Sequence, residues 1–175
     1  FAMRHAMGAI RERTSVPAVL EDDTAEGEAA RRSVGEAAYA LHVQQFACAG
    51  LNYGYFYDDS PIIAHDGEPV PAYSMHEYTP STVPGCRTPH FWLRDGRSLL
   101  DAVGPWFTLL RFDTRVDVSA LQRAARDAGV PLQLLDVEAD AIPAAYQHSL
   151  VLDRPDHHVA WRGNELPADP ARLID

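Results

Sequence analysis

The stretch Pro84–Phe112, PGCRTPHFWLRDGRSLLDAVGPWFTLLRF, contains the two clearest buried-strand signals of the sequence. His90–Leu93 and Phe107–Phe112 are short apolar runs, and each has the length and aromatic content of a strand rather than a helix. The segment between them has turn signals at both ends, Asp95-Gly96 and Gly104-Pro105. The stretch therefore predicts the opening of a small α/β domain.

The residues that follow predict one helix between two strands. Asp117 can cap a helix that ends at Gly129, and Leu132–Val137 is the next strand. The buried stripe of that helix is Leu121, Ala124, Ala125 and Ala128. A strand, a helix and a strand in this order imply parallel pairing through a right-handed crossover.

The last part of the sequence predicts an antiparallel hairpin and a short final helix. The expected elements are a turn of helix at Ile142–Tyr146, strands at Ser149–Leu152 and His158–Arg162, and a helix that begins at Pro170. The hairpin turn is expected around Asp153-Arg154-Pro155-Asp156, and we interpret the cluster Asp156-His157-His158 as part of a solvated hairpin turn. Parallel strands followed by an antiparallel hairpin are the order of a thioredoxin-like sheet.

Helices are predicted before this domain. Residues 1–13 can form a short helix, and a longer one runs from a capping box at Asp23 to about Cys48, with Gly50 as its C-terminal cap. The apolar face of the longer helix is mostly alanine: Val34, Ala37, Ala38 and Leu41. No large apolar surface in the sequence before it matches this face. We therefore expect the face to pack on a domain outside this chain, or on a second copy of it.

Tyr53, Tyr55 and Tyr57 alternate with other residues at the period of a strand, which predicts one aromatic face. Such a face could line a pocket for an aromatic substrate, but aromatic side chains are also enriched in cores and interfaces. Ile62–Ala64 is expected to resume the strand before a hairpin turn at Asp66-Gly67. Residues 69–87 are rich in proline and predict an extended linker.

The composition excludes several classes of partner. The net charge is -10, and all 15 basic residues are arginine, so an acidic chain without a basic stripe argues against nucleic acid and anionic membrane. The apolar runs are too short to span a membrane. Cys48 and Cys86 are widely spaced, which is typical of a reduced cytoplasmic protein rather than of a zinc site.

Familiar catalytic motifs are absent from the sequence. There is no Cys pair for disulfide exchange, no GxG for dinucleotide binding and no GxSxG nucleophile elbow. His157 and His158 are adjacent on an expected strand and point to opposite faces, so they do not form a metal site. We therefore assign no catalytic, cofactor-binding or metal-binding residue from these motifs.

Several spaced motifs together resemble one enzyme family. They are Gly50-x-Asn52-x-Gly54-x-x-Tyr57, Pro84-Gly85-x-Arg87-x-Pro89-His90-x-Trp92-Leu93, Asp95-Gly96-x-Ser98-Leu99-x-Asp101-x-x-Gly104-Pro105-x-Phe107-Thr108-Leu109-Leu110 and Arg154-Pro155-Asp156-x-His158-Val159-Ala160-Trp161-Arg162. Their order and spacing resemble the C-terminal region of FAD-dependent aromatic-ring monooxygenases. That branch includes phenol hydroxylase, 3-(3-hydroxyphenyl)propionate hydroxylase and the polyketide and rifampicin hydroxylases.

The resemblance implies an α/β fold with a thioredoxin-like C-terminal domain. It implies that residues 1–68 end the flavin-binding catalytic part, residues 69–87 are the linker, and residues 88–175 form a thioredoxin-like domain without CxxC. The chain, which begins with Phe1, would then be a C-terminal fragment of a longer enzyme.

The parent enzyme would use FAD, NAD(P)H and O2 to hydroxylate a small aromatic substrate. The fragment itself would hold no cofactor and would be inactive. Its partners would be the N-terminal flavin domain and further copies in a homo-oligomer. The alternative is a stand-alone thioredoxin-like interaction or dimerisation module without catalysis.

Overall fold

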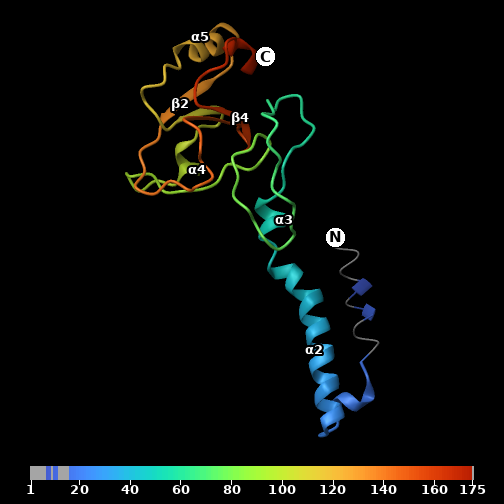
Figure 1. The fold of residues 1–175 in the computed structure, drawn as a ribbon. Helices are drawn as coiled ribbons and strands as arrows, with labels where there is room; N and C mark the ends of the chain where they lie inside the picture. Colours follow the sequence, from blue (N-terminus) through green and yellow to red (C-terminus); the bar gives the residue numbers. More distant parts are fainter. Residues whose placement is uncertain (1–6, 9, 12–15, 175) are drawn as a thin grey trace.

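The computed structural model describes residues 7–8, 10–11 and 16–174. Figure 1 shows an α/β domain at one end and a long helix, α2 (Ala25–Phe46), that extends away from it. The 3₁₀ helix η1 (Ala18–Glu21) packs on α2, and the short helix α3 (Ala49–Tyr53) follows it. A segment without helix or strand, residues 54–98, joins α3 to the domain.

Four strands form the sheet of the α/β domain, in the order β2-β1-β3-β4. Their bounds are β1 (Phe107–Arg111), β2 (Leu132–Asp136), β3 (Leu150–Asp153) and β4 (Val159–Gly163). β1 pairs with β2 in parallel and with β3 antiparallel, and β3 pairs with β4 antiparallel. The predicted α/β class and the order of parallel strands followed by an antiparallel hairpin are confirmed.

The two faces of the sheet carry separate hydrophobic clusters, because successive residues of β1 point to opposite faces. Leu109 belongs to the cluster covered by α5 (Ser119–Asp127), and Leu110 belongs to the cluster covered by α4 (Leu99–Ala102). Both side chains are completely buried. The 3₁₀ helix η2 (Pro170–Leu173) packs beside α5 and confirms the predicted final helical turn.

The prediction of a sheet strand at His90–Leu93 is wrong. The segment folds back on its own turn: Leu93 N donates to Arg97 O at 2.9 Å, and Trp92 forms a single bridge with Ser98. Phe91 and Leu93 are nevertheless buried, so the apolar run indicated burial correctly although it forms no paired strand. Ile142–Tyr146 also differs from its prediction, because it forms a turn instead of a helix.

The start and the end of α2 differ from the prediction by a few residues. Its N-cap is Thr24 rather than Asp23, since the Thr24 hydroxyl accepts a hydrogen bond from Gly27 N at 3.1 Å. Its C-cap is Ala47, and Gly50 lies within α3 instead. The helix predicted for residues 1–13 falls largely outside the described residues.

The predicted strand through Tyr53, Tyr55 and Tyr57 is also wrong. Its first half is α3, where a side chain in place of Gly50 would clash with the carbonyl oxygen of Ser74. This close approach selects the helical path, and local alternation of tyrosines cannot reveal it. Ile62–Ala64 likewise forms no strand, although Ala64 N donates to Ala160 O of β4 at 2.8 Å.

The proline-rich segment contains no helix or strand, yet its end is buried. Residues 82–86 are buried, and Gly85 N donates to Val159 O at 2.8 Å. This part of the segment therefore lies against the β3–β4 hairpin. Among the residues that the structure describes, no helix has both the length and the apolar character needed to cross a membrane.

Candidate functional site

The structure separates the three tyrosines into two neighbourhoods. Tyr55 and Tyr57 both pack on the imidazole of His158, with ring centroids 5.0 Å and 4.8 Å away. Tyr53 lies instead against Tyr78, at 6.0 Å between centroids. The predicted single aromatic face is therefore divided between the hairpin and the segment before it.

His158 is completely buried beneath Tyr55 and Tyr57, so the prediction of a solvated turn is wrong for this residue. Its Nδ1 donates to the carbonyl oxygen of Asp156 at 2.9 Å. Burial lowers the pKa of His158 because a buried imidazolium loses its hydration. The neutral ring is therefore part of the packed interior, with both tyrosines against it.

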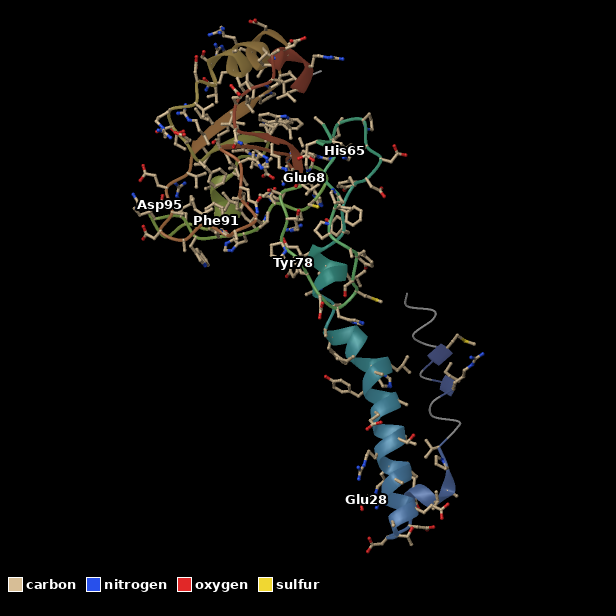
Figure 2. All side chains as sticks on the ribbon, viewed as in Figure 1. Glu28, His65, Glu68, Tyr78, Phe91 and Asp95 are labelled. Atoms are coloured by element: carbon tan, nitrogen blue, oxygen red, sulfur yellow. The ribbon has the colours of Figure 1, made fainter. Side chains whose placement is uncertain are left out.

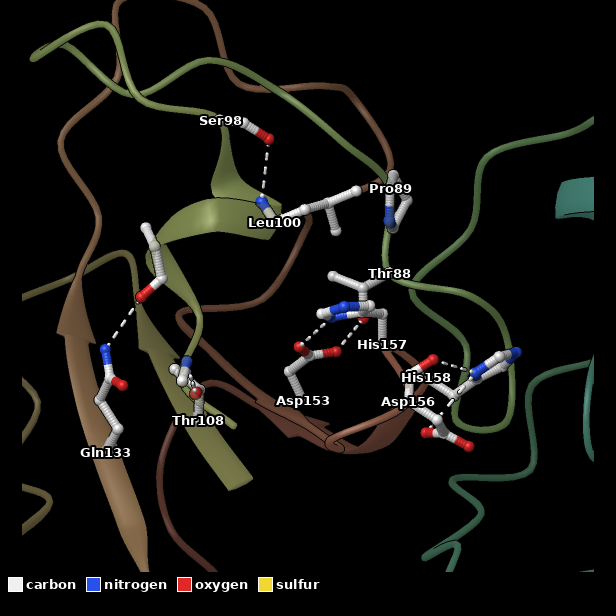
Figure 3. Close-up of polar contacts among 12 residues, drawn as sticks. Thr88, Pro89, Ser98, Leu100, Thr108, Gln133, Asp153, Asp156, His157 and His158 are labelled. Carbon is white, nitrogen blue, oxygen red and sulfur yellow. Dashed lines mark hydrogen bonds and ion pairs between the residues drawn. The ribbon is translucent and has the colours of Figure 1, made fainter. Parts of the chain in front are cut away.

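The neighbouring His157 forms a polar cluster with Asp153 and Thr88, which Figure 3 shows at the end of the β3–β4 hairpin. The carboxylate of Asp153 is 1% exposed and accepts a short hydrogen bond from the Thr88 hydroxyl. His157 Nδ1 lies 3.7 Å from the same carboxylate. Here a buried acid is held by one hydroxyl and one imidazole.

Both members of this ion pair have shifted pKa values. Burial raises the pKa of Asp153, against the opposing effects of His157 and Thr88. The carboxylate of Asp153 in turn raises the pKa of His157. His157 also has a φ of 59°, in the left-handed region that favours glycine. The contact with Asp153 therefore offsets the cost of the left-handed backbone conformation at His157.

A second polar cluster joins the segment after α3 to β4. Arg162 is 7% exposed, and its guanidinium lies 2.7 Å from the Asp66 carboxylate and 2.6 Å from that of Glu68. It also donates to the Thr82 hydroxyl at 3.2 Å. The turn at Asp66 thus has an ion pair that fixes it to the sheet.

The candidate binding site is a cavity beside α3. Its volume is ≈ 20 Å³, and Tyr53, Tyr55, Tyr78 and Arg87 are among its lining residues. This volume suits one small polar group rather than an aromatic ring. Of the three predicted pocket residues, Tyr53 and Tyr55 line the cavity and Tyr57 does not. A substrate-lining role for the three remains a prediction.

Sequence reasoning did not find Asp153 and Arg162 as members of polar clusters, or Arg87 as a lining residue of the cavity. Each depends on contacts between segments far apart in the chain, such as Arg162 with Asp66. The one local signal was the charged run around His157. In the residues that the structure describes, no three His, Cys, Asp or Glu side chains gather as a metal site would require.

Comparisons with known proteins relate these features to one enzyme family. A family model described as aromatic-ring hydroxylase, C-terminal, matches residues 81–174. Phenol 2-monooxygenase from Pseudomonas sp. is 31% identical over 176 residues, which cover 90% of this chain and 29% of that protein. The FAD-dependent monooxygenase opdD from Penicillium oxalicum is 30% identical over 163 residues, with 89% of this chain and 31% of that protein covered.

A solved structure agrees with the sequence relatives. The rebeccamycin biosynthetic enzyme RebC with reduced flavin is 37% identical and superimposes with a TM-score of 0.78, over 98% of this chain and 32% of that one. The chain thus spans about a third of the length of the relatives it matches. These matches cover the α/β domain and most of the helical part before it, and the chain therefore belongs to the aromatic-ring hydroxylase family, of which it represents the C-terminal region.

Proposed function

We propose that this chain is the supporting C-terminal region of an enzyme that uses FAD, NAD(P)H and O2 to hydroxylate a phenolic or polyketide-like aromatic ring. Two relatives are named as a phenol 2-monooxygenase and an FAD-dependent monooxygenase, and RebC was solved with reduced flavin. A bound flavin would supply the activation of O2 and the transfer of one oxygen atom. The residues of this chain would have a structural role and would support the catalytic part.

The observation that carries this proposal is the exposed surface of α2. Tyr39 and Phe46 are 71% and 82% exposed, and Val34, Ala38 and Leu41 are only partly covered. A helix with uncovered aromatic side chains gains stability by packing on another surface. The occupant we propose is the upstream part of the parent enzyme, because the relatives extend over about three times the length of this chain.

Within the described part of the chain, the N-termini of α2 and α5 do not fit the pyrophosphate of a flavin dinucleotide. Binding a pyrophosphate calls for glycines that let the backbone approach it at a helix N-terminus. The first turn of α2 carries Glu26 and Glu28, whose charges would repel phosphate. At α5, the amide of Ser119 is already bonded to the Asp117 carboxylate at 2.9 Å. We infer that FAD is held by residues of the parent outside this chain.

Two further expectations belong to the same proposal. Cys48 and Cys86 form no disulfide, which suits a reducing compartment such as the cytoplasm. The exposed side chains of α2 could also contact a second copy in a homo-oligomer of the parent. The first expectation rests on the two free thiols, and the second rests on the exposed side chains of α2.

The test is to express this chain together with its upstream sequence. The longer protein should purify yellow and oxidise NADH or NADPH faster when phenolic compounds are added. The 175-residue chain alone should do neither. A start codon directly before this chain, or a longer protein without flavin, would favour a stand-alone interaction module and overturn the proposal.

A further inference from the structure

Arg87 places a positive charge at the cavity beside α3. Its guanidinium carbon lies 5.8 Å from the centroid of the Tyr53 ring, and Tyr53 lies 6.0 Å from Tyr78. Figure 2 labels Tyr78 next to α3, and all three residues line the cavity. The cavity therefore combines a cation with two aromatic rings.

The charge of Arg87 has no carboxylate partner within the described part of the chain. Other partly or fully buried arginines differ in this respect: Arg154 pairs with Asp156 at 2.8 Å, and Arg162 pairs with Asp66 at 2.7 Å. Glu77 also lines the cavity but forms no ion pair with Arg87. A partly buried cation that lacks a partner gains from binding an anion.

The backbone around Arg87 is fixed before any ligand arrives. Arg87 bridges to His158, and the next residue, Thr88, donates its amide to His157 O at 2.9 Å. These contacts tie the arginine to the β3–β4 hairpin. These contacts fix the backbone of Arg87, which limits the positions that its guanidinium can take and so reduces the conformational entropy lost on binding.

We propose that Arg87 binds the carboxylate of an aromatic acid at this cavity, with Tyr53 and Tyr78 beside the aromatic ring. A guanidinium matches a planar carboxylate through two parallel hydrogen bonds. The cavity volume of ≈ 20 Å³ accommodates the carboxylate group. The ring then lies at the cavity mouth against the tyrosines. The choice of an aromatic acid rests on the proposed function, in which the parent enzyme acts on aromatic compounds.

The same chemistry could come from an Asp or Glu side chain of the upstream part of the parent. An ion pair of that kind would occupy Arg87 permanently and would exclude a free acid. The two sources differ in one respect, since only the protein carboxylate depends on the upstream sequence. The experiment therefore compares the 175-residue chain with the longer protein.

The probes are benzoate and benzamide, which share a shape and differ in charge, titrated into each protein by calorimetry. The 175-residue chain should bind benzoate at least about fivefold more tightly than benzamide, as expected for a charge-assisted pair. Arg87→Gln should remove this preference without changing the melting temperature. Arg97→Gln is the matched control, because Arg97 pairs with Asp95 on the surface, and it should keep the preference.

Equal binding of the two probes by the unmodified chain, or a preference that survives in Arg87→Gln, would overturn the proposal. A second outcome would also overturn the proposal: the longer protein shows no preference for benzoate, and its Arg87→Gln variant melts at a lower temperature. Arg87 would then pair with a carboxylate of the upstream part. Benzoate binding needs no flavin. A longer protein that prefers benzoate but lacks flavin would therefore contradict the proposed function alone.

Discussion

Replacing His157 with glycine separates two roles of this residue in the hairpin turn. A non-glycine residue at a φ of 59° costs about 1 kcal/mol, so glycine would stabilise the turn if backbone conformation alone mattered. The same change removes the cation beside Asp153, which is 1% exposed. Breaking a buried ion pair costs about 3–5 kcal/mol.

The expected loss in the free energy of unfolding is smaller than about 3–5 kcal/mol. The His157 side chain is 29% exposed and lies 3.7 Å from Asp153, and Thr88 still donates to the carboxylate. We take about 2–3 kcal/mol for the pair, which leaves His157→Gly about 1–2 kcal/mol less stable after the gain in the turn. Urea denaturation monitored by circular dichroism measures this difference.

The pH dependence of the free energy of unfolding tests the same ion pair independently. Asp153 raises the pKa of His157 above its unfolded value, so the stabilisation is present near pH 6 and is lost as pH rises through the folded pKa. The difference between the unmodified chain and His157→Gly should therefore be larger at about pH 6 than at about pH 9. His157→Asn is the control, since asparagine tolerates the left-handed region without a charge.

A His157→Gly variant that is more stable than the unmodified chain would refute this reasoning. The pairing with Asp153 would then contribute less than the backbone strain. A His157→Asn variant as stable as the unmodified chain at about pH 6 would likewise show that the imidazolium adds nothing to the turn.

Three further substitutions test other parts of the fold. Gly50→Ala should cost about 2 kcal/mol or more in urea denaturation because of the clash with Ser74, and an unchanged midpoint would contradict the packing of α3. Arg162→Met should cost about 1–2 kcal/mol at neutral pH, mainly by leaving the Asp66 carboxylate without its partner, because the Glu68 side chain is 61% exposed and water hydrates it. Although burial raises the pKa of Asp66, the bond from Arg162 lowers it overall, so this cost should shrink as pH falls through that pKa, and a pH-independent cost would be inconsistent. Thr24→Ala should cost about 1 kcal/mol of α2 stability, read from helical ellipticity during melting, whereas no loss would mean that the cap is unimportant.

The sheet was largely predictable from the sequence because its signals are local. Phe107–Phe112 and Leu132–Val137 are apolar runs bounded by turn residues, and both became paired strands of nearly the predicted length. The α5 stripe was correct at Leu121 and Ala125, which are buried. In β1 and α5, residues that the sequence pattern predicts to be buried, such as Leu109 and Leu121, are buried in the structure.

The segment around α3 could not be predicted because distant contacts decide its path. Gly50 becomes helical where the chain meets Ser74, and Leu51 N donates to Met75 O at 3.2 Å. Such contacts join residues more than twenty positions apart. The tyrosine alternation carried no information about them.

The buried histidines of the β3–β4 turn could not be predicted from the sequence for a related reason. His157 and His158 belong to a charged run, which is usually solvated in a hairpin turn. They are covered because residues 82–88 lie along the hairpin and Tyr55 and Tyr57 close over it. Burial of this turn therefore results from tertiary packing rather than from local composition.

The most direct test of the central claim is a titration of FAD into two purified proteins, this chain and the same chain with its upstream sequence, followed by equilibrium dialysis. We predict that the longer protein retains close to one FAD per chain and that the 175-residue chain retains none. Stoichiometric retention of FAD by the 175-residue chain would contradict the assignment of this region to architecture.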